Sequence, residues 1–422
     1  MPLKISFLLL CVCILVFPIN YSFALSLRLF DILYILLFIV VLFTNPKVNK
    51  LLLILVIFIF IVFFISTLNG LIIKGPFETN KIVFVYKYFL IFSLPWVVVN
   101  IIKYDHQIRR INSLLLIVYF LLCIWVYVYS YLLYNGTIIG NIRPSFPLSN
   151  DYIYSDAHMY SSYLGFFLVA YIFYLRHYFN HRQPLILFIL INGLMALLLT
   201  GSRTGIVLVL LSIFIYLIYF LIKLPKFKIS FSKRKLISLI ATSIVFIFSL
   251  LYFTEYINDF YQNYEKLISR AFNFQFSTDQ SSLGRIKKLE LSIEDINLSG
   301  VFIGLGLSSS LIWYDGLLSI LLAHGGVILL ISVLLFYWFI FLSLYIKIKN
   351  AKLEVVKLFR VLSLLVIIYF FANIITEYIF ISRNAFPILL LISNLYVSIK
   401  YKNSLTFNKV IYSKKHYNDL YG

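Results

Sequence analysis

Charged residues are scarce in this chain. Asp, Glu, Lys and Arg make up only 12% of its 422 residues, whereas they make up about one quarter of an ordinary soluble protein. Hydrophobic residues account for 62% of the sequence, and long apolar runs recur from one end to the other. This composition excludes an ordinary soluble domain and predicts a polytopic integral membrane protein.

The sequence also lacks the short motifs that bind nucleotides and metals. It contains no GxxxxGK[ST], no HExxH, no CxxC, and no GxGxxG after a strand. Its three cysteines, Cys11, Cys13 and Cys123, all fall inside apolar runs, which predicts neither a disulfide nor a metal cluster. We therefore expect no metal and no cofactor, and we expect any chemistry to occur in or beside the extracytoplasmic loops.

The apolar runs predict an all-α fold with about 12 transmembrane helices in a single polytopic membrane domain, residues 1–422. The runs are continuous and lack the alternation of a barrel strand, and a helix needs roughly 17–25 residues to cross a bilayer. The first run is interpreted as an uncleaved span rather than a signal peptide, because a polytopic chain needs no cleavage. The predicted spans are 5–24, 26–44, 51–69, 82–102, 113–134, 159–176, 184–200, 204–222, 236–254, 317–346, 358–376 and 384–400.

The net charge of +20 has a topological explanation. When the twelve spans are threaded from a cytoplasmic N-terminus, 24 of the 36 Lys and Arg residues fall in inside loops, and most acidic residues fall outside. This asymmetry agrees with the positive-inside rule and places both termini in the cytoplasm. The basic charge therefore predicts no nucleic-acid partner, only an attraction to the lipid bilayer.

Two loops are long, and the threading places both outside. One covers about 135–158, and the larger one, 255–316, lies between helices 9 and 10. Within the larger loop, TEYINDFYQNYEKLISRAFNF has the spacing of an amphipathic helix and STDQSSLGR is expected to be a polar connection. IKKLELSIEDINL predicts a helix that ends at Ser299–Gly300, and GLGLSSS predicts an irregular segment near the membrane interface. Long ordered loops are often functional.

The outer face carries arginines that could bind an anion. An arginine stays charged, and its planar fork suits a phosphate. Each one alone could be an interfacial anchor, but Arg203 lies at the tip of a tight hairpin, TGSRT, where Gly201 and Gly205 permit close backbone approach. If the outer arginines converge, they would form a diphosphate site. The candidates are Arg143, Arg203, Arg270, Arg285 and Arg383.

Outer carboxylates and histidines are candidate acid–base groups. Asp315 stands at the start of span ten beside Trp313 and Tyr314, where it could act as a base or simply cap the helix. His158 precedes span six. His324 lies inside span ten and is expected to be a neutral, hydrogen-bonded core histidine. Span ten itself is long enough to contain an extra turn or a short re-entrant helix.

The order of these motifs resembles the O-antigen polymerase/ligase superfamily of bacterial membrane proteins. The resemblance rests on TGSRTG between two hydrophobic runs, on GRIKKLELSIEDINLSGVFIGLG in the large loop, and on WYDGLLSILLAHGGVILLI after it. RPSFPLSND is similar to the R…PN segment of that family, and the resemblance covers about residues 140–345. It implies about ten to fourteen spans and a large periplasmic loop.

Two activities occur in that superfamily. Its ligases carry a His–Asn pair where this chain has Asp315–Gly316, so the resemblance favours a Wzy-type polymerase over an O-antigen ligase-like glycan transferase. It implies polymerisation of undecaprenyl-diphosphate-linked oligosaccharide repeat units into O-antigen or capsule, on the outer face of the bacterial cytoplasmic (inner) membrane. A chain-length regulator and a flippase are the implied partners. A lipid-linked oligosaccharide flippase or transporter remains the alternative from another class.

A polymerase of this kind is a metal- and nucleotide-independent glycosyltransferase, because its donor already carries a diphosphate leaving group. Arg203, Arg285 and Arg143 are predicted to stabilise the charge that develops on the diphosphate. Asp315 is predicted to deprotonate or orient the acceptor hydroxyl. Further substrate contacts are expected from Arg383, Arg270, His158, Trp313 and Tyr314, the two aromatic residues by stacking on sugar rings.

Overall fold

The computed structural model describes residues 2–19, 28–44, 46, 50–134, 144, 146–147, 157–175, 179, 183–202, 205–214, 280–310, 316–348, 353–375 and 385–401. Over these ranges every regular element is a helix, and no strand occurs in them. The predicted all-α class is confirmed for this part of the chain.

The helices follow the predicted spans closely. The elements are α1 (Pro2–Val16), α2 (Leu29–Leu42), α3 (Lys50–Lys74), the 3-10 turn η2 (Thr79–Ile82), α4 (Val83–Ile101), α5 (Asp105–Tyr134), α6 (Ala157–Ala170) with the π-turn η3 (Tyr171–Leu175), α8 (Gln183–Leu199), the helix Gly205–Phe214, α12 (Gln280–Ser299), the 3-10 turn η5 (Gly306–Ser308), α13 (Leu317–Ile348), α14 (Leu353–Ile375) and the helix Ala385–Tyr401. The predicted span 236–254 lies outside the described residues.

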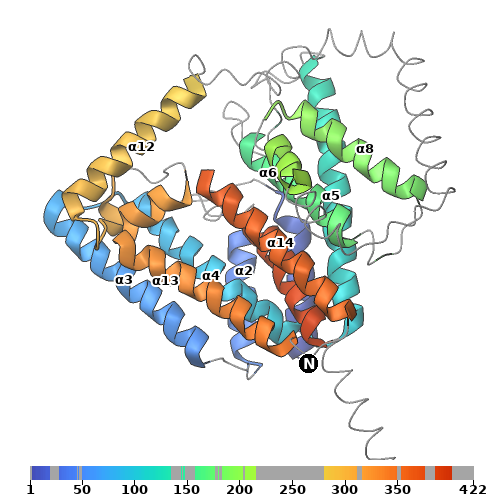
Figure 1. Ribbon diagram of the computed structural model, residues 1–422, viewed down its shortest axis with the longest axis horizontal. Coiled ribbons are helices and arrows are strands. Elements are labelled where there is room, and N and C mark those ends of the chain that lie inside the picture. Colours follow the sequence, from blue (N-terminus) through green and yellow to red (C-terminus); the bar gives the residue numbers. More distant parts are fainter. Residues whose placement is uncertain are drawn as a thin grey trace, which may run out of the picture.

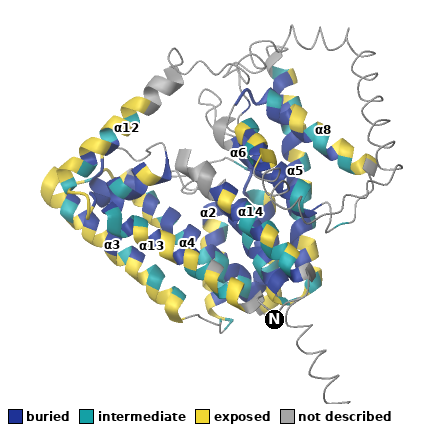
Figure 2. Ribbon diagram, viewed as in Figure 1, coloured by how far each residue is buried: buried dark blue, intermediate teal, exposed yellow. Residues whose placement is uncertain are grey.

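Some of the helices have the length and composition of membrane spans. Four are long and apolar enough to cross a bilayer, namely Lys50–Lys74, Val83–Ile101, Asp105–Leu132 and Leu317–Ile340. Several others are shorter and apolar. On α3, large apolar side chains such as Ile54, Phe64 and Ile72 point outward and are 60%, 62% and 85% exposed, so this face suits lipid (Figure 2). The architecture is that of a helical membrane protein.

Some helix ends differ from the predicted spans. Helix α3 continues to Lys74, five residues past the predicted end, and stops where Gly75 takes φ +86 before Pro76. Helix α5 begins at Asp105, eight residues early, because a polar first turn is compatible with a helix. There Gln107 accepts hydrogen bonds from the preceding N–H groups of Lys103 (2.7 Å) and Tyr104 (3.2 Å).

The helix predicted from IKKLELSIEDINL is confirmed, and it ends at Ser299 before Gly300, which has φ +78. The polar connection predicted from STDQSSLGR is wrong from residue 280 onward, because α12 begins at Gln280. Polar residues do not prevent helix formation on an exposed surface, and the single Gly284 costs only about 1 kcal/mol. Arg285 therefore lies in the second turn of α12 rather than at its start.

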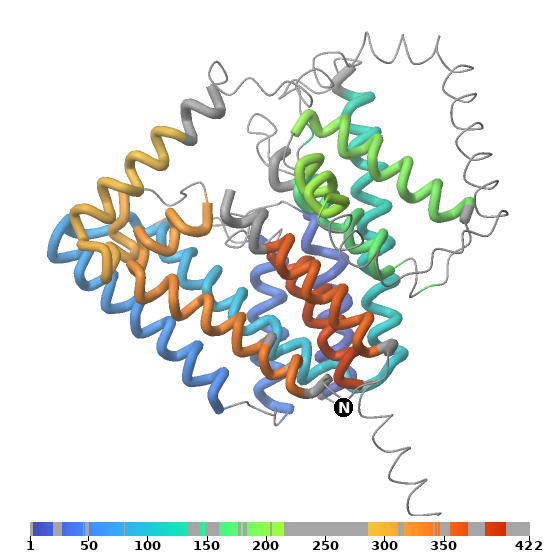
Figure 3. The backbone as a smooth tube through the Cα atoms, viewed as in Figure 1, coloured from blue at the N-terminus to red at the C-terminus, as the bar shows by residue number. Residues whose placement is uncertain are grey.

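The helices form two groups with a central layer between them (Figures 1 and 3). Helices α3, α12 and α13 pack together on one side of the molecule, and α5, α6 and α8 pack together on the other. Helices α2 and α14 lie between the two groups. Helix α13 packs against α14, and α14 packs against α6. Residues predicted to act together therefore come from different sides of this arrangement.

Helix α13 is interrupted at Gly326, where φ is 64° and ψ is −165°. The sequence predicted room for an extra turn or a short re-entrant helix in this long span, and the structure shows a break at Gly326. The segment 301–305 fills the break: the Leu305 N–H donates to the Ala323 carbonyl (2.8 Å), and the Val327 N–H donates to the Val301 carbonyl (2.9 Å). A break inside an apolar helix is tolerated when its freed backbone groups find partners.

Candidate functional site

Most predicted site residues lie outside the described part of the chain. Arg203 and Asp315 belong to this group, together with Arg143, Arg270, Trp313, Tyr314 and Arg383. For Arg285 in α12 and His158 in α6 the helical backbone is described and the side chain is not. The site can therefore be built only from the described residues that flank the predicted ones.

The hairpin tip around Arg203 is fastened to helix α6 on both sides of the arginine. The Ser161 hydroxyl donates to the Ser202 carbonyl (3.3 Å), and the Gly205 N–H donates to the same hydroxyl (3.0 Å). Ser161 lies in the second turn of α6 and is fully buried. The Ser161 side chain thus connects α6 with Ser202, which follows α8, and with Gly205 of the helix Gly205–Phe214.

Glycine makes this close contact possible. A Cβ added at Gly205 would lie 2.3 Å from the Ser161 carbonyl oxygen, and one added at Gly165 would lie 2.7 Å from the Gly205 carbonyl oxygen. Gly201 adopts φ +57, a conformation that favours glycine. The prediction of close backbone approach at this hairpin is confirmed for Gly205, and for Gly201 the structure shows the positive φ instead. Small residues commonly allow two membrane helices to cross this closely.

The residue before Arg203 carries a buried hydroxyl that makes no hydrogen bond to the protein. Ser202 is 2% exposed, and no hydrogen-bond partner for its Oγ exists among the described residues. Its backbone groups are occupied, since the N–H donates to Thr200 Oγ1 (3.4 Å) and the carbonyl accepts from Ser161. Buried polar atoms normally have partners, so this hydroxyl needs an explanation.

Two other predicted arginines have flanking residues at the same end of α6. Phe146, three residues after Arg143, is fully buried and packs edge-on against Tyr160 of α6, with ring centroids 4.7 Å apart. Three residues span at most about 11 Å of chain. The Cα atom of Arg143 is therefore within about 11 Å of that of Phe146, which packs against Tyr160.

Phe386, three residues after Arg383, reaches α6 through a chain of rings. Its ring centroid is 6.0 Å from that of Phe17, which is 5.5 Å from that of Tyr163 on α6. Phe386 also packs against Phe30 at the start of α2 (4.6 Å). The described flanks of Arg203 and Arg143 therefore contact the first two turns of α6, whereas Phe386 is connected to α6 only through Phe17. We call the described residues Phe146, Tyr160, Ser161, Tyr163, Ser202 and Gly205 the α6 cluster.

Arg285 belongs to the other side of the molecule, whereas His158 lies in α6. Arg285 is carried by α12, which packs against α13 and α3 and lies away from α6 (Figure 1). Trp313, Tyr314 and Asp315 fall between Ser310 and Gly316, at the start of α13. The described contacts do not join this group to the α6 cluster, so a single site containing Arg203, Arg285 and Asp315 stays a prediction.

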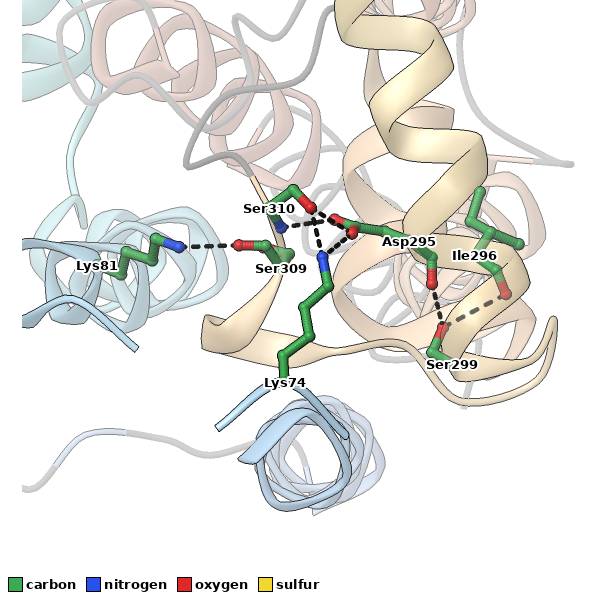
Figure 4. Close-up of polar contacts among 7 residues, drawn as sticks. All are labelled: Lys74, Lys81, Asp295, Ile296, Ser299, Ser309 and Ser310. Carbon is green, nitrogen blue, oxygen red and sulfur yellow. Dashed lines mark hydrogen bonds and ion pairs between the residues drawn. The ribbon is translucent and has the colours of Figure 1, made fainter. Parts of the chain in front are cut away.

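On that side, a buried carboxylate holds the loop after α12 onto α3 (Figure 4). Asp295 is fully buried; its Oδ1 forms an ion pair with Lys74 Nζ and accepts from the Ser310 hydroxyl (2.6 Å), and its Oδ2 accepts from the Ser310 N–H (2.6 Å). Lys74 also donates to the Ser310 hydroxyl. A buried charge needs both a counterion and hydrogen bonds, and Asp295 has both.

Lys81 completes this arrangement, which we call the Asp295 clamp: Lys74, Lys81, Asp295, Ser309 and Ser310. Its Nζ donates to the Ser309 carbonyl (2.8 Å). Burial lowers the pKa of Lys81, while the carboxylates of Glu78 and Asp295 act in the opposite direction and the charge of Lys74 reinforces the lowering. The lysines and the carboxylates neutralise one another, so the clamp is better suited to hold the loop than to attract an anion.

The segment GLGLSSS is irregular, as predicted, but it is packed among helices. Residues 304–309 are buried, and Gly306 with φ +56 lies so close to Thr67 of α3 that an added Cβ would be 2.3 Å from Thr67 Oγ1. The Asn69 side-chain amide donates to the Gly304 carbonyl (3.2 Å), and the Leu307 N–H donates to Thr67 Oγ1 (3.3 Å). Side chains of α3 therefore satisfy a buried loop.

Two ionisable residues inside the spans, His324 and Lys87, lie among aromatic side chains. His324 is 1% exposed, lies against the rings of Phe84 and Phe63, and has Nδ1 3.5 Å from the Tyr88 hydroxyl. This agrees with the predicted core histidine. Lys87 is buried, with Nζ 5.0 Å from the centroid of the Phe84 ring, a cation–π contact.

The sequence interpretation missed Ser161 and Ser202 at the α6 cluster, and Lys74 and Asp295 at the clamp. A signal for the first pair was present: Ser161 and Gly165 are four residues apart, the small-residue spacing of a close helix crossing. For the clamp no local signal existed, because Lys74 and Asp295 are separated by 221 positions. Comparisons with known protein families and with curated proteins found no match to this chain.

Proposed function

We propose that this protein polymerises lipid-diphosphate-linked oligosaccharide repeat units into a surface polysaccharide on the outer face of the bacterial cytoplasmic membrane. The observation that supports the proposal is that the described residues next to Arg203 and Arg143 contact the start of α6. Arginines that converge on one place would provide the charge that a diphosphate requires. The resemblance of the hairpin, loop and span motifs to O-antigen polymerases supports the same function.

The reaction follows from the chemistry of the donor. The acceptor hydroxyl oxygen attacks the anomeric carbon of the growing chain, the bond from that carbon to the diphosphate oxygen breaks, and its electron pair leaves with the lipid diphosphate. The acceptor proton passes to a base, for which Asp315 is the candidate. Fixed arginines stabilise the charge that develops on the diphosphate, and such preorganised electrostatics is often the largest catalytic contribution.

The pattern of contacts supports the predicted topology of about twelve spans. Lys74 pairs with Asp295, and Ser161 bonds the hairpin tip; the threading assigns all of these positions to the outer side. A separate hydrogen-bond network lies at positions that the threading assigns to the inner side. In it, Asn112 donates to the Tyr174 hydroxyl (3.1 Å) and Asn394 donates to Asn112 (2.8 Å). None of these four contacts joins an inner position to an outer one.

The proposal is tested by changing single arginines in the producing strain. We expect Arg203→Ala to shorten the surface polysaccharide to single repeats at normal protein level, and Arg285→Ala to do the same if α12 serves the same reaction. Arg360→Ala is the matched control, since this exposed arginine on α14 is predicted to lie inside. If Arg203→Ala and Arg285→Ala both preserve chain length, the diphosphate role is wrong.

A transporter of lipid-linked oligosaccharide is the second candidate, because interrupted helices like α13 often form transport sites. In this chain, however, segment 301–305 occupies the break and bonds its backbone groups. The two functions differ in the product that remains when the gene is deleted. Loss of a polymerase leaves single repeat units on the cell surface, whereas loss of a flippase leaves none.

A further inference from the structure

Helix α12 carries three different faces along its length. One face packs on α13 and α3 and contains the buried residues Ser292 and Asp295. A second, apolar stripe of side chains that are each about half exposed consists of Ile286, Leu289 and Ile293. A third, charged stripe that is also exposed consists of Lys287, Glu290 and Glu294. Within each stripe the residues are three and then four positions apart, so their side chains share one side of the helix. Leu298 is also exposed, but it lies on the other side of the charged stripe.

This division into three faces fits a helix that lies where protein, lipid and water meet. A helix on the surface of a soluble domain needs only an apolar face toward the core and a polar face toward water. In α12 the protein core already covers the first face, and the exposed apolar stripe is additional to it. In an interfacial membrane helix, such a stripe lies against the acyl chains, while the charged stripe faces the headgroups and water.

The position of α12 relative to the membrane spans agrees with this environment. Its C-terminal end is fixed to the end of α3 by the ion pair between Asp295 and Lys74. Helix α3 is long and apolar enough to cross a bilayer, and Lys74 is its last residue. The end of α12 therefore lies at the level of the membrane surface, on the side that the threading assigns as outer. From there α12 extends crosswise to α3 (Figures 1 and 3).

The apolar exposure continues past the end of α12. Val301, Phe302 and Ile303 are all exposed, Phe302 to 70%, whereas the next two residues are buried. The carbonyl groups of Val301 and Phe302 accept from the N–H groups of Val327 (2.9 Å) and Ile328 (3.5 Å), just past the break in α13. The backbone of this segment thus has partners in α13 while its side chains extend outward, which is the arrangement that a lipid environment permits.

A contact with α3 gives the level of this segment. The Asn69 side-chain amide donates to the carbonyl of Gly304, the residue that follows Ile303. Asn69 is five residues before Lys74, which corresponds to about 8 Å along the helix axis. Ile72, which lies between them on α3, is 85% exposed and belongs to the face that suits lipid. The exposed side chains of 301–303 therefore begin at the level of a lipid-facing part of α3.

We propose that α12 and residues 301–303 form a surface that binds the outer leaflet of the bilayer. The apolar stripe of α12 lies at the boundary between headgroups and acyl chains, and Phe302 lies among the acyl chains. The occupant is lipid because the surface meets the lipid-facing side of α3 at the same level and is bordered by a charged stripe. This anchor holds α12, which carries Arg285, at the membrane surface. It does not depend on the proposed reaction.

Spin labels on the full-length protein in phosphatidylcholine liposomes test this surface. A nitroxide is attached to the single new cysteine of Leu289→Cys, of Phe302→Cys or, as the matched control, of Glu290→Cys, the neighbour of Leu289 on the charged stripe. All three positions are exposed, so the substitutions should leave the fold unchanged. The wild type, whose three cysteines are buried, is treated in parallel as the blank. Collisions of each label with oxygen, which concentrates in lipid, are compared with collisions with a water-soluble nickel chelate.

We expect the ratio of oxygen to nickel collisions to be severalfold higher at positions 289 and 302 than at 290, and highest at 302. The inference is overturned if the labels at 289 and 302 collide with the nickel chelate as often as the label at 290 does. It is also overturned if both labels are shielded from both reagents and show dipolar broadening that disappears on dilution with wild type, because a second copy of the chain would then cover the surface. Ile293→Cys and Ile303→Cys repeat the measurement on α12 and on the segment after it.

Discussion

The two sides of this molecule treat buried polar groups in opposite ways. At the Asp295 clamp, a fully buried carboxylate has a counterion and two further donors. At the α6 cluster, the Ser202 hydroxyl is equally well buried and has no partner among the residues that the structure describes. A satisfied network stabilises a fold, whereas an unsatisfied one costs free energy unless something else occupies it. The clamp therefore stabilises the fold, whereas the Ser202 hydroxyl makes no comparable contribution.

Breaking the clamp should have the largest effect on stability. Lys74→Met removes the counterion of the buried Asp295 carboxylate, and we expect a loss of about 3 kcal/mol in the free energy of unfolding. The Asp295→Asn substitution in the same chain should recover much of this loss, because no unpaired charge remains. Unfolding in detergent measures both variants. Lys287→Met, at an exposed position of α12, is the control and should change little.

Crowding the α6 cluster should have the next largest effect. In Gly205→Ala the new methyl group would lie 2.3 Å from the Ser161 carbonyl oxygen, so the helices must separate. Overpacking of this kind costs about 1–3 kcal/mol. We also expect shortened polysaccharide chains, because the segment that carries Arg203 loses its close contact with α6. Normal chain length with a lowered melting temperature would show that the contact serves stability alone.

A Ser→Ala substitution made once in the Asp295 clamp and once in the α6 cluster compares the two sides directly. Ser310→Ala removes a hydroxyl that donates to Asp295, and should lower the free energy of unfolding by about 1 kcal/mol. Ser202→Ala removes an unpartnered hydroxyl, and should leave the stability unchanged or raise it. A loss of stability in Ser202→Ala would mean that this hydroxyl already has a structural partner.

The smallest expected effect is the dependence of the free energy of unfolding on pH. Burial lowers the pKa of Lys81 below its ordinary value, so the unfolded state binds more protons than the folded state in the window between the two pKa values. The free energy of unfolding should therefore rise as pH increases through that window toward about 10.5, the ordinary lysine value. Melting temperatures of the wild type and of Lys81→Met across this range measure the difference. An equal rise in both would assign it to other groups.

The regular part of the fold was largely readable from the sequence. The apolar run 51–69 became α3, and 82–102 became α4 with ends shifted by at most one residue, because hydrophobicity alone selects segments that avoid water. Helix ends were less readable where local chemistry decided them, as at Gly75–Pro76 and at the polar first turn of α5. The location of the candidate arginines on an outer hairpin and loops came from charge asymmetry, and it remains a prediction.

The tertiary structure decided which distant segments meet. No local pattern could indicate that 301–305 would enter a break in α13, or that Thr67 and Asn69 of α3 would bond a loop more than 230 positions away. The sequence by itself determined that apolar helices dominate and that Arg203 stands between Gly201 and Gly205 in the chain. Only packing decided that Ser161 binds both Ser202 and Gly205, while the Ser202 hydroxyl is buried with no partner among the described residues, because burial and hydrogen bonding depend on neighbours that the chain supplies from elsewhere.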